Sequence, residues 1–420
     1  MGHVVQVVTA RPTQLYQFFG NLLLLSGVGF WVYLAYFKIC CEEDISNHGF
    51  TILGTLLLLI GFILRNTALT WELTSPIRGL KPLEFINGVE VRRVPVSRKR
   101  HDVATIWEMA TFVGSATWFC LNNLREFQPD VIHIFFAIPD GPIGWVLKRT
   151  HKTPYIISLR GADVPSDEVK RFAKAYKFLR PIVAGLFRDA DSVVSVSNGL
   201  RSHALELAPD IPIEVVTNAI DLSRFTPPLQ QVQREATRII YVGRLVASKS
   251  PETLIRAAAL LKTMEVEPFQ LQLIGEGEQR SRLEKMVLEH NLAREIIFSG
   301  WIGHPDLIDY YRQADIFVTA TSWEGMPNTV LEAMATGLPV VGTRAPGLDQ
   351  LVVEGQNGYL VEAGDAQAMA DRLRRLINNP YERGRMGRES RKIAEREFSW
   401  EYITAQYVDI YERVRRKCKD

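Results

Sequence analysis

The sequence has little cysteine and no excess of either charge. Only four of its 420 residues are cysteine, and their positions show neither the spacing of a zinc site nor a disulfide framework. The 49 basic and 47 acidic side chains leave a formal net charge of +2 at pH 7, so no overall basic surface predicts nucleic-acid binding. We therefore expect a reducing compartment, no catalytic thiol and no nucleic-acid partner.

Two stretches near the N-terminus lack charged side chains. The first is the apolar segment 18–37, which lies inside the uncharged residues 12–37, and the second is the segment 45–64. About twenty apolar residues can span a bilayer as a helix. Because no small-residue cleavage site follows, a signal peptide explains the pair poorly, and we interpret it as a membrane hairpin. A buried core helix, or a stretch introduced by a misread gene, is the alternative.

The charges around these two segments predict their orientation. Basic residues flank the pair, whereas the connection 38–48 carries three acids against one lysine. Cytoplasmic loops are enriched in lysine and arginine, so both flanks should face the cytoplasm. We therefore expect a membrane-associated protein whose catalytic domains lie in the cytoplasm. The basic flanking residues are Arg11, Arg65, Arg78 and Lys81, and the acids are Glu42, Glu43 and Asp44.

From residue 89 onward, short apolar strands alternate with helices, which predicts parallel sheets covered on both faces. A polar, proline-rich passage at 218–228 interrupts this alternation. The sequence thus predicts an α/β protein with two Rossmann-like domains facing each other across a cleft, at 1–220 and 221–395, and a C-terminal helix at 396–420 that packs back on the first. Strands are expected at 89–96, 130–136, 155–159, 192–197, 238–242, 269–274, 296–298 and 316–319, and helices at 103–127, 141–149, 167–188, 199–207, 251–264, 278–290 and 306–314.

The stretch T-S-W-E-G-M-P-N-T-V-L-E-A-M-A-T-G-L-P-V-V-G, residues 321–342, places Glu324 and Glu332 eight residues apart. Pro327 suits the beginning of a helix, and Gly337 suits its end. Backbone N–H groups at a helix start bind phosphate, while a nearby carboxylate can hold sugar hydroxyls. The pattern therefore suits a sugar diphosphate, although without its context it would indicate only two solvated acids.

Two further loops follow predicted strands. The first, G-R-L-V-A-S-K, carries Arg244 and Lys249, whose two cations can neutralise a diphosphate leaving group; the alternative is a basic surface turn. The second, Gly275–Gly277, permits a close backbone approach to a ligand. Because parallel sheets bind ligands at the carboxyl ends of their strands, we expect these loops and the glutamate stretch to line one site.

In this order and spacing, the three loops resemble the nucleotide-sugar domain of glycosyltransferase family 4, retaining enzymes with the GT-B fold. The resemblance is dense from 215 to 411 and includes V-V-T-N-A-I-D-L-S-R-F, Y-V-G-R-L-V-A-S-K and L-I-G-E-G. It implies that Arg244 and Lys249 hold the diphosphate, that Glu324 contacts the donor sugar and that Glu332 holds the ribose. The donor-binding positions it implies are Gly243, Gly275, Glu276, Gly325, Met326, Pro327, Asn328 and Glu332.

Upstream, D-V-I-H-I-F-F-A-I-P-D-G-P and I-S-L-R-G-A-D-V-P resemble the acceptor domain of the same family. Many members have a histidine where Arg160 stands, so the resemblance implies a polar catalytic role for Arg160 and Asp163. Asp349 stands where a glutamate is common. The N-terminal M-G-H-V-V-Q-V-V-T-A-R-P resembles the second strand of the family, so the first strand and its glycine-rich loop are expected to be absent. Either another segment substitutes for them or activity is impaired.

These observations predict a retaining glycosyltransferase that moves a sugar from a nucleoside diphosphate donor to a hydroxyl acceptor, such as a lipid-linked or cell-envelope saccharide. No Asp-x-Asp sits in the donor-domain loops and no side-chain nucleophile stands out. We therefore expect no metal and no cofactor beyond the donor, with cations and helix dipoles carrying the leaving-group charge. The alternatives are a non-catalytic or truncated membrane-bound homologue that still binds nucleotide sugar, and a GT-B epimerase or phosphorylase.

Overall fold

The computed structural model describes residues 5–7, 83–94, 105–161, 164, 173–229 and 234–417. The predicted membrane segments 18–37 and 45–64 lie outside the described residues, as does Asp163, so the hairpin stays a prediction. Within the described ranges no helix is both long and apolar enough to cross a bilayer. The chain divides into two compact units, Met1–Asp130 with Val146–Thr153, and Val131–Trp145 with Pro154–Asp420.

The first unit contains a small mixed sheet and a long helix. Strand β1 (Val5–Val7) pairs in parallel with β3 (Val89–Arg92), and β3 pairs antiparallel with β2 (Leu83–Ile86). Asn87 and Gly88 form the turn between β2 and β3, since both residues have the positive φ, 50° and 83°, of a two-residue hairpin. Helix α3 (Ile106–Phe127) begins at a capping box, in which Thr105 and Glu108 each accept a hydrogen bond from the backbone N–H of the other.

The second unit begins with a four-stranded sheet. Its strands are β4 (Ile132–Phe135), β5 (Tyr155–Leu159), β6 (Ser192–Ser195) and β7 (Ile213–Val215), all parallel and adjacent in chain order. Helices connect them, namely α4 (Gly141–His151), whose second half belongs to the first unit, α5 (Ala173–Asp189) and α6 (Asn198–Leu207). Every residue of β5 is buried, as expected for a central parallel strand.

A six-stranded parallel sheet follows, in the order β10-β9-β8-β11-β12-β13. Its strands are β8 (Thr237–Val242), β9 (Phe269–Ile274), β10 (Ile296–Gly300), β11 (Ile316–Val318), β12 (Val340–Thr343) and β13 (Gly358–Val361). The helices of this region are α7 (Pro251–Thr263), α8 (Arg280–Glu289), α9 (Leu307–Gln313), α10 (Asn328–Ala335), α11 (Ala366–Asn378) and α12 (Pro380–Glu397).

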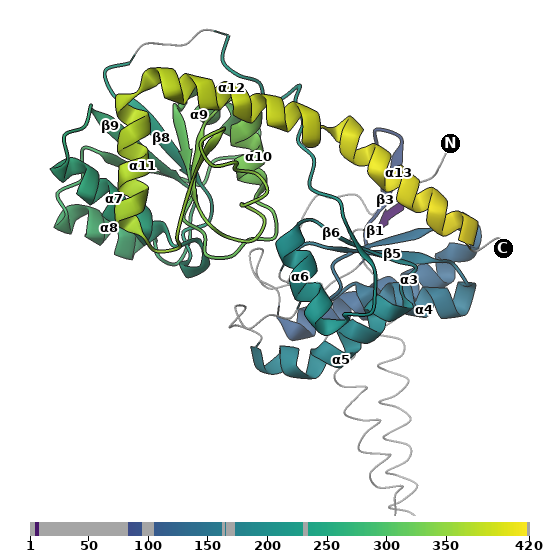
Figure 1. The fold of residues 1–420 in the computed structure, drawn as a ribbon. Coiled ribbons are helices and arrows are strands. Elements are labelled where there is room, and N and C mark those ends of the chain that lie inside the picture. The colour runs from purple at the N-terminus through teal and green to yellow at the C-terminus, as the bar shows by residue number, and fades with distance from the viewer. Residues whose placement is uncertain are drawn as a thin grey trace, which may run out of the picture. The chain divides into compact units, whose positions relative to one another are not determined.

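The two faces of this sheet bury alternate residues of each strand. Ile239 and Tyr241 of β8 lie in a cluster with residues of α7 and α11, whereas Ile240 and Val242 lie in a cluster with residues of α9, α10 and α12. Figure 1 shows β8 between α11 on one side and α9 and α10 on the other. Side chains of a strand alternate between faces, so both faces must be apolar, which explains the continuous apolar runs in the sequence.

The last helix, α13 (Trp400–Lys417), packs on the four-stranded sheet. Its Ile403, Ile410 and Val414 form one buried cluster with residues of β5, β6 and the segment after β7. A polar contact supports the packing, because the Tyr411 hydroxyl lies 2.7 Å from Nδ1 of His133 on β4. The end of the chain thus completes the core of a sheet formed more than a hundred residues earlier.

Candidate donor-binding site

The site lies where the strand order of the six-stranded sheet reverses. From the central strand β8 the chain moves outward through β9 to β10, then returns to β11 on the other side of β8 and continues to β12. The loops after β8 and β11 therefore begin at a switch point, the place where open α/β sheets bind ligands. They contact each other, because the N–H of Ser322 and the hydroxyl of Thr321 donate to the Ser248 carbonyl at 3.4 and 3.2 Å.

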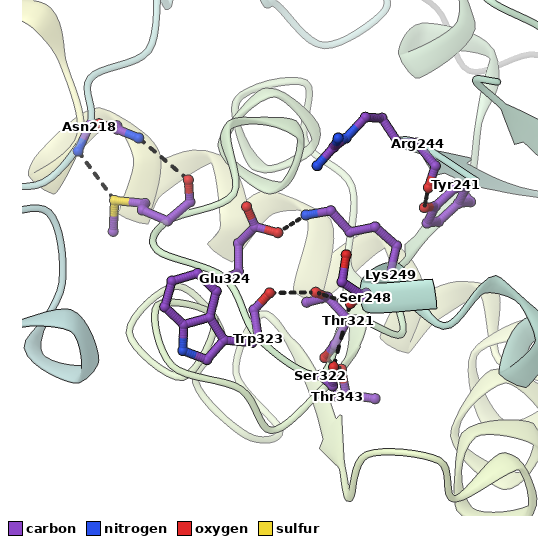
Figure 2. Close-up of polar contacts among 11 residues, drawn as sticks. Asn218, Tyr241, Arg244, Ser248, Lys249, Thr321, Ser322, Trp323, Glu324 and Thr343 are labelled. Atoms are coloured by element: carbon purple, nitrogen blue, oxygen red, sulfur yellow. Dashed lines mark hydrogen bonds and ion pairs between the residues drawn. The ribbon is translucent and has the colours of Figure 1, made fainter. Parts of the chain in front are cut away.

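Lys249 and Glu324 meet between these two loops. Lys249 ends the short 3-10 helix Ala247–Lys249 in the loop after β8, and its ammonium forms an ion pair with the Glu324 carboxylate. Figure 2 shows the pair, with Arg244 extending from the same loop as Lys249. Burial, and secondarily the positive charge of Arg244, lower the pKa of Lys249 to about 8. The predicted cation pair and the first glutamate are thus brought together.

Glycines allow the loops after β8 and β9 to approach closely. Gly275 has a φ of 135°, and a Cβ on it would run into the carbonyl of Gly243. The contact is fixed by backbone hydrogen bonds, from Gly243 N–H to the Ile274 carbonyl at 3.0 Å and from Leu245 N–H to the Glu276 carbonyl at 2.9 Å. The Glu276 carboxylate is held in an ion pair with Arg280. The glycine-rich loop therefore serves loop-to-loop packing in this structure.

Helix α10 begins beside the ion pair. Pro327 precedes its first residue, Asn328, and the helix ends at Ala335 before Gly337, whose φ is 81°. The predicted helix is confirmed, although Pro327 caps it rather than occupying its first turn. Gly325 and Met326 are buried, and a Cβ on Gly325 would meet the Arg160 carbonyl at 2.5 Å. The first turn of such a helix offers N–H groups without partners in the helix.

Glu332 lies one turn further along α10 and is buried. Its side chain is 7 % exposed; one carboxylate oxygen accepts from the Tyr311 hydroxyl at 2.7 Å and the other lies 3.0 Å from Nε2 of His304. Burial, followed by the charge of Glu332, raises the pKa of Tyr311, which therefore remains a donor. The reading of Glu332 as a solvated acid is thus wrong, because this carboxylate is held in place by two partners.

Arg160 follows β5 and is fixed by three neighbours. Its guanidinium donates to Oδ1 of Asn218 at 2.7 Å, lies 3.5 Å from the Tyr407 hydroxyl and stacks over Phe135 with 4.7 Å to the ring centroid. Nearby, burial and then the charge of Arg160 lower the pKa of His133 to about 4. Arg160 is therefore tied to β4, to α13 and to the segment after β7.

Four residues that contact the predicted site residues in the structure had no role assigned from the sequence. Tyr311 and His304 hold Glu332, Asn218 joins Arg160 to the start of α10, and Trp323 lies against Gly161. Asn218 lies in the motif V-V-T-N-A-I-D, shortly after β7, and His304 lies in the loop between β10 and α9. The position of Asn218 shortly after a strand was a signal that could have found it, whereas Tyr311 lies within α9 and carried no such signal. In the part of the chain that the structure describes, no group of three or more acidic, histidine or cysteine side chains could hold a metal ion.

This arrangement, a cationic loop and a helix start at the switch point of a parallel sheet, suits the binding of a phosphorylated ligand. Comparison with known protein families shows the class to which the chain belongs. The family model described as "Glycosyl transferases group 1" matches residues 229–393, and the one described as "Glycosyl transferase 4-like domain" matches residues 67–219. The chain belongs to this glycosyltransferase family, and the predicted family membership is confirmed.

Curated relatives agree. The chain is 29 % identical over 331 residues to D-inositol 3-phosphate glycosyltransferase of Corynebacterium urealyticum, covering 72 % of this chain and 76 % of that protein. It is 28 % identical over 257 residues to the lipopolysaccharide core biosynthesis glycosyltransferase LpsE of Rhizobium meliloti, covering 58 % of this chain and 72 % of that protein. The protein is a glycosyltransferase that uses a nucleotide sugar.

Solved structures show the fold. Sucrose-phosphate synthase from Thermosynechococcus elongatus aligns with a TM-score of 0.72 at 22 % identity, covering 84 % of this chain and 93 % of that chain. HepE of Anabaena in complex with UDP-glucose aligns with a TM-score of 0.63 at 18 % identity, covering 78 % of this chain and 86 % of that chain. The predicted α/β GT-B fold with parallel sheets is confirmed.

Proposed function

We propose that the protein transfers a sugar, with retention of anomeric configuration, from a nucleoside diphosphate to a hydroxyl acceptor. The observation that carries the proposal is the meeting of Arg244, Lys249 and Glu324 beside the start of α10. A diphosphate that leaves with its electrons needs cations and N–H donors at that moment, and this edge of the sheet supplies both. The departing phosphate then guides attack from the same face of the sugar.

Each predicted residue has a place in this scheme. Arg244 and Lys249 neutralise the diphosphate, and the turn from Gly325 to Asn328 binds its oxygens. Glu324 contacts the hydroxyls of the donor sugar once Lys249 turns to the phosphate. Glu332, held by Tyr311 and His304, binds the ribose through its remaining lone pairs. Gly243, Gly275 and Glu276 let the loops after β8 and β9 close around the donor, and Arg160 and Asp163 keep the polar catalytic role that the family resemblance implies.

No metal is required in this proposal, because two cations and a helix start carry the leaving-group charge. We propose the domain division 1–220, 221–395 and 396–420, with the last segment returning to the first domain. The buried cluster of α13 with β5 and β6 supports the return of the C-terminal helix.

We also propose attachment to a membrane through 18–37 and 45–64, with the catalytic domains in the cytoplasm and a lipid-linked or envelope saccharide as acceptor. The relative named for lipopolysaccharide core biosynthesis supports this acceptor class. Exposed apolar side chains of the first unit support the proposal that this unit lies at a membrane surface, since Phe85 is 68 % and Trp107 59 % exposed. Tryptophan is enriched at membrane interfaces.

Thermal melts of the full chain against UDP-, GDP-, ADP- and dTDP-sugars test the donor assignment. A ligand that binds the native state raises Tm by mass action, so one base and sugar should shift Tm specifically. Release of the nucleoside diphosphate is then measured with that donor, and the anomeric configuration of the product is read by NMR. Specific binding without turnover would favour the non-catalytic alternative, and an inverted product would refute retention.

A further inference from the structure

Asn218 joins the acceptor-side arginine to the start of α10. Its Oδ1 accepts from the Arg160 guanidinium at 2.7 Å, and its Nδ2 donates to Oδ1 of Asn328 at 2.8 Å and to the Met326 carbonyl at 3.4 Å. Its backbone N–H lies 3.2 Å from the Met326 sulfur, a contact drawn in Figure 2. One carboxamide therefore connects the loop after β5 with the turn that precedes α10.

The chemistry of the partners determines which way this amide points. A guanidinium has only donors, so it must face the oxygen of Asn218, and a peptide carbonyl has only an acceptor, so Met326 must face the nitrogen. Both neighbours require the same orientation. Asn218 can then only donate a hydrogen bond to Asn328, so Asn328 must accept it with its side-chain oxygen. The amide hydrogens of Asn328, which is exposed, are thereby left for a ligand.

We propose that Asn218 is a positioning residue that orients the Asn328 side chain so that it offers N–H donors, not its oxygen, to the diphosphate of the donor. Phosphate oxygens only accept hydrogen bonds, so an Asn328 amide turned the other way would present its oxygen to an anion. Arg160 fixes the orientation of the Asn218 amide, and the Asn218 amide in turn fixes the orientation of the Asn328 amide. We call this chain of two hydrogen bonds the relay. The inference rests on the proposed phosphate-binding role of the turn before α10.

A double-mutant cycle in the full chain tests the relay. The dissociation constant of UDP, or of GDP or ADP where the wild-type melts select that base, is measured by calorimetry for Asn218→Ala, Asn328→Ala and the double variant. Asn218→Ala is expected to weaken binding by about fivefold in the wild-type background and by less than about twofold when Asn328 is already alanine, since residues acting as one unit are not additive. Equal losses in both backgrounds would overturn the relay.

Asn218→Asp separates the two ends of the amide. The introduced carboxylate still accepts from Arg160 but cannot donate to Asn328, so Asn328 must turn its amide hydrogens toward that carboxylate and its oxygen toward the phosphate. The expected loss is about tenfold, larger than for alanine, and it should shrink in the Asn328→Ala background to the part due to the added charge. A loss from this variant that is unchanged without Asn328 would contradict the proposal.

The controls distinguish a loss of folding from a loss of phosphate binding by Asn328 and from a loss of its orientation by Asn218. Asn122→Ala, at an exposed position of α3 where the side chain donates to the Trp118 carbonyl of the same helix, should leave affinity and Tm unchanged. If Asn218→Ala lowers Tm strongly, Asn218→Ser replaces it in the cycle. Should Asn328→Ala bind as tightly as wild type, the phosphate role of Asn328 fails and the relay with it, whereas turnover by the wild-type protein still tests the transferase activity independently.

Discussion

The six-stranded sheet and the sheets of the N-terminal part are built differently. Strands β8 to β13 form one parallel sheet, whereas the described strands before residue 216 divide into a sheet of three and a sheet of four. In the six-stranded sheet the loops after neighbouring strands are bonded to each other, as Gly243 is to Ile274 and Ser322 to Ser248. The loops of the proposed donor site are therefore held together by backbone hydrogen bonds, which the substitution of an exposed side chain leaves intact.

Arg160 after β5 and His133 on β4 are held by side chains instead. Arg160 is fixed by Asn218, Tyr407 and Phe135, and His133 by Tyr411 and Ser158. No described strand joins the β1-β3-β2 sheet to the β4–β7 sheet. The comparison teaches that substitutions in the donor loops should act on chemistry and binding, whereas substitutions beside β4 and β5 should act on local stability as well.

The largest effect is expected at Arg244. Arg244→Ala removes a cation proposed to stabilise the leaving group, and loss of one such transition-state contact costs about 100-fold to 1,000-fold in kcat. Tm should stay near the wild-type value, because the backbone holds the loop. Arg160→Ala is expected to lose about tenfold in kcat and also to lower Tm. Initial rates and melts of both variants check this.

Arg256→Ala is the matched control, since Arg256 is an exposed arginine of α7 that has no role in the proposed site. Its rate should equal that of the wild type. If Arg244→Ala retained a third or more of the wild-type kcat, the leaving-group role of Arg244 would be wrong.

A second prediction concerns the close approach of the loops after β8 and β9. Gly275→Ala places a Cβ against the Gly243 carbonyl and forces the loops apart, so affinity for the nucleoside diphosphate should fall by about tenfold to 100-fold. Gly355 also has a positive φ, 74°, but a Cβ there would meet nothing within 4 Å. Gly355→Ala therefore carries the backbone strain alone, and equal affinity losses in the two variants would contradict the packing explanation.

The same contrast explains how much was predictable from sequence. Apolar runs, the glycines and Pro327 are local signals, and they located β8 to β11, α10 and the meeting of Arg244, Lys249 and Glu324. The partners of Glu332 could not be read this way, because His304 and Tyr311 reach it through folding and have no fixed spacing to it. Asn218 belongs to a motif of the family resemblance, yet its proposed role depends on three segments that only the fold brings together.

A third prediction concerns acid stability near β4. The pKa of His133 is lowered to about 4, against about 6.5 when unfolded, so the unfolded chain binds more protons between these values. Stability should therefore fall as pH drops from 6.5 toward 4, by about 2 kcal/mol between pH 7 and pH 5. Hydrogen exchange should locate the loss in β4 and α13 rather than in the six-stranded sheet.

His133→Gln removes this titration, so its stability should change less between pH 7 and pH 5 than that of the wild type. His290→Gln, at an exposed position after α8, is the control and should keep the wild-type pH profile. Uniform acid loss across both sheets would show that His133 is not the cause.

The smallest effect is expected from the titration of Lys249. Because its pKa is lowered to about 8, the free protein loses this cation as pH rises through that value, and affinity for a nucleoside diphosphate should fall. Between pH 7.5, where the phosphates are already ionised, and pH 9, the dissociation constant should rise by about fivefold.

Lys249→Arg keeps the charge throughout and should flatten the profile even if it binds more weakly. Lys285→Arg, at an exposed position of α8, should leave the profile as in the wild type. An unchanged slope in Lys249→Arg would assign the titration to another group and would leave Arg244 as the cation on which the donor loops depend.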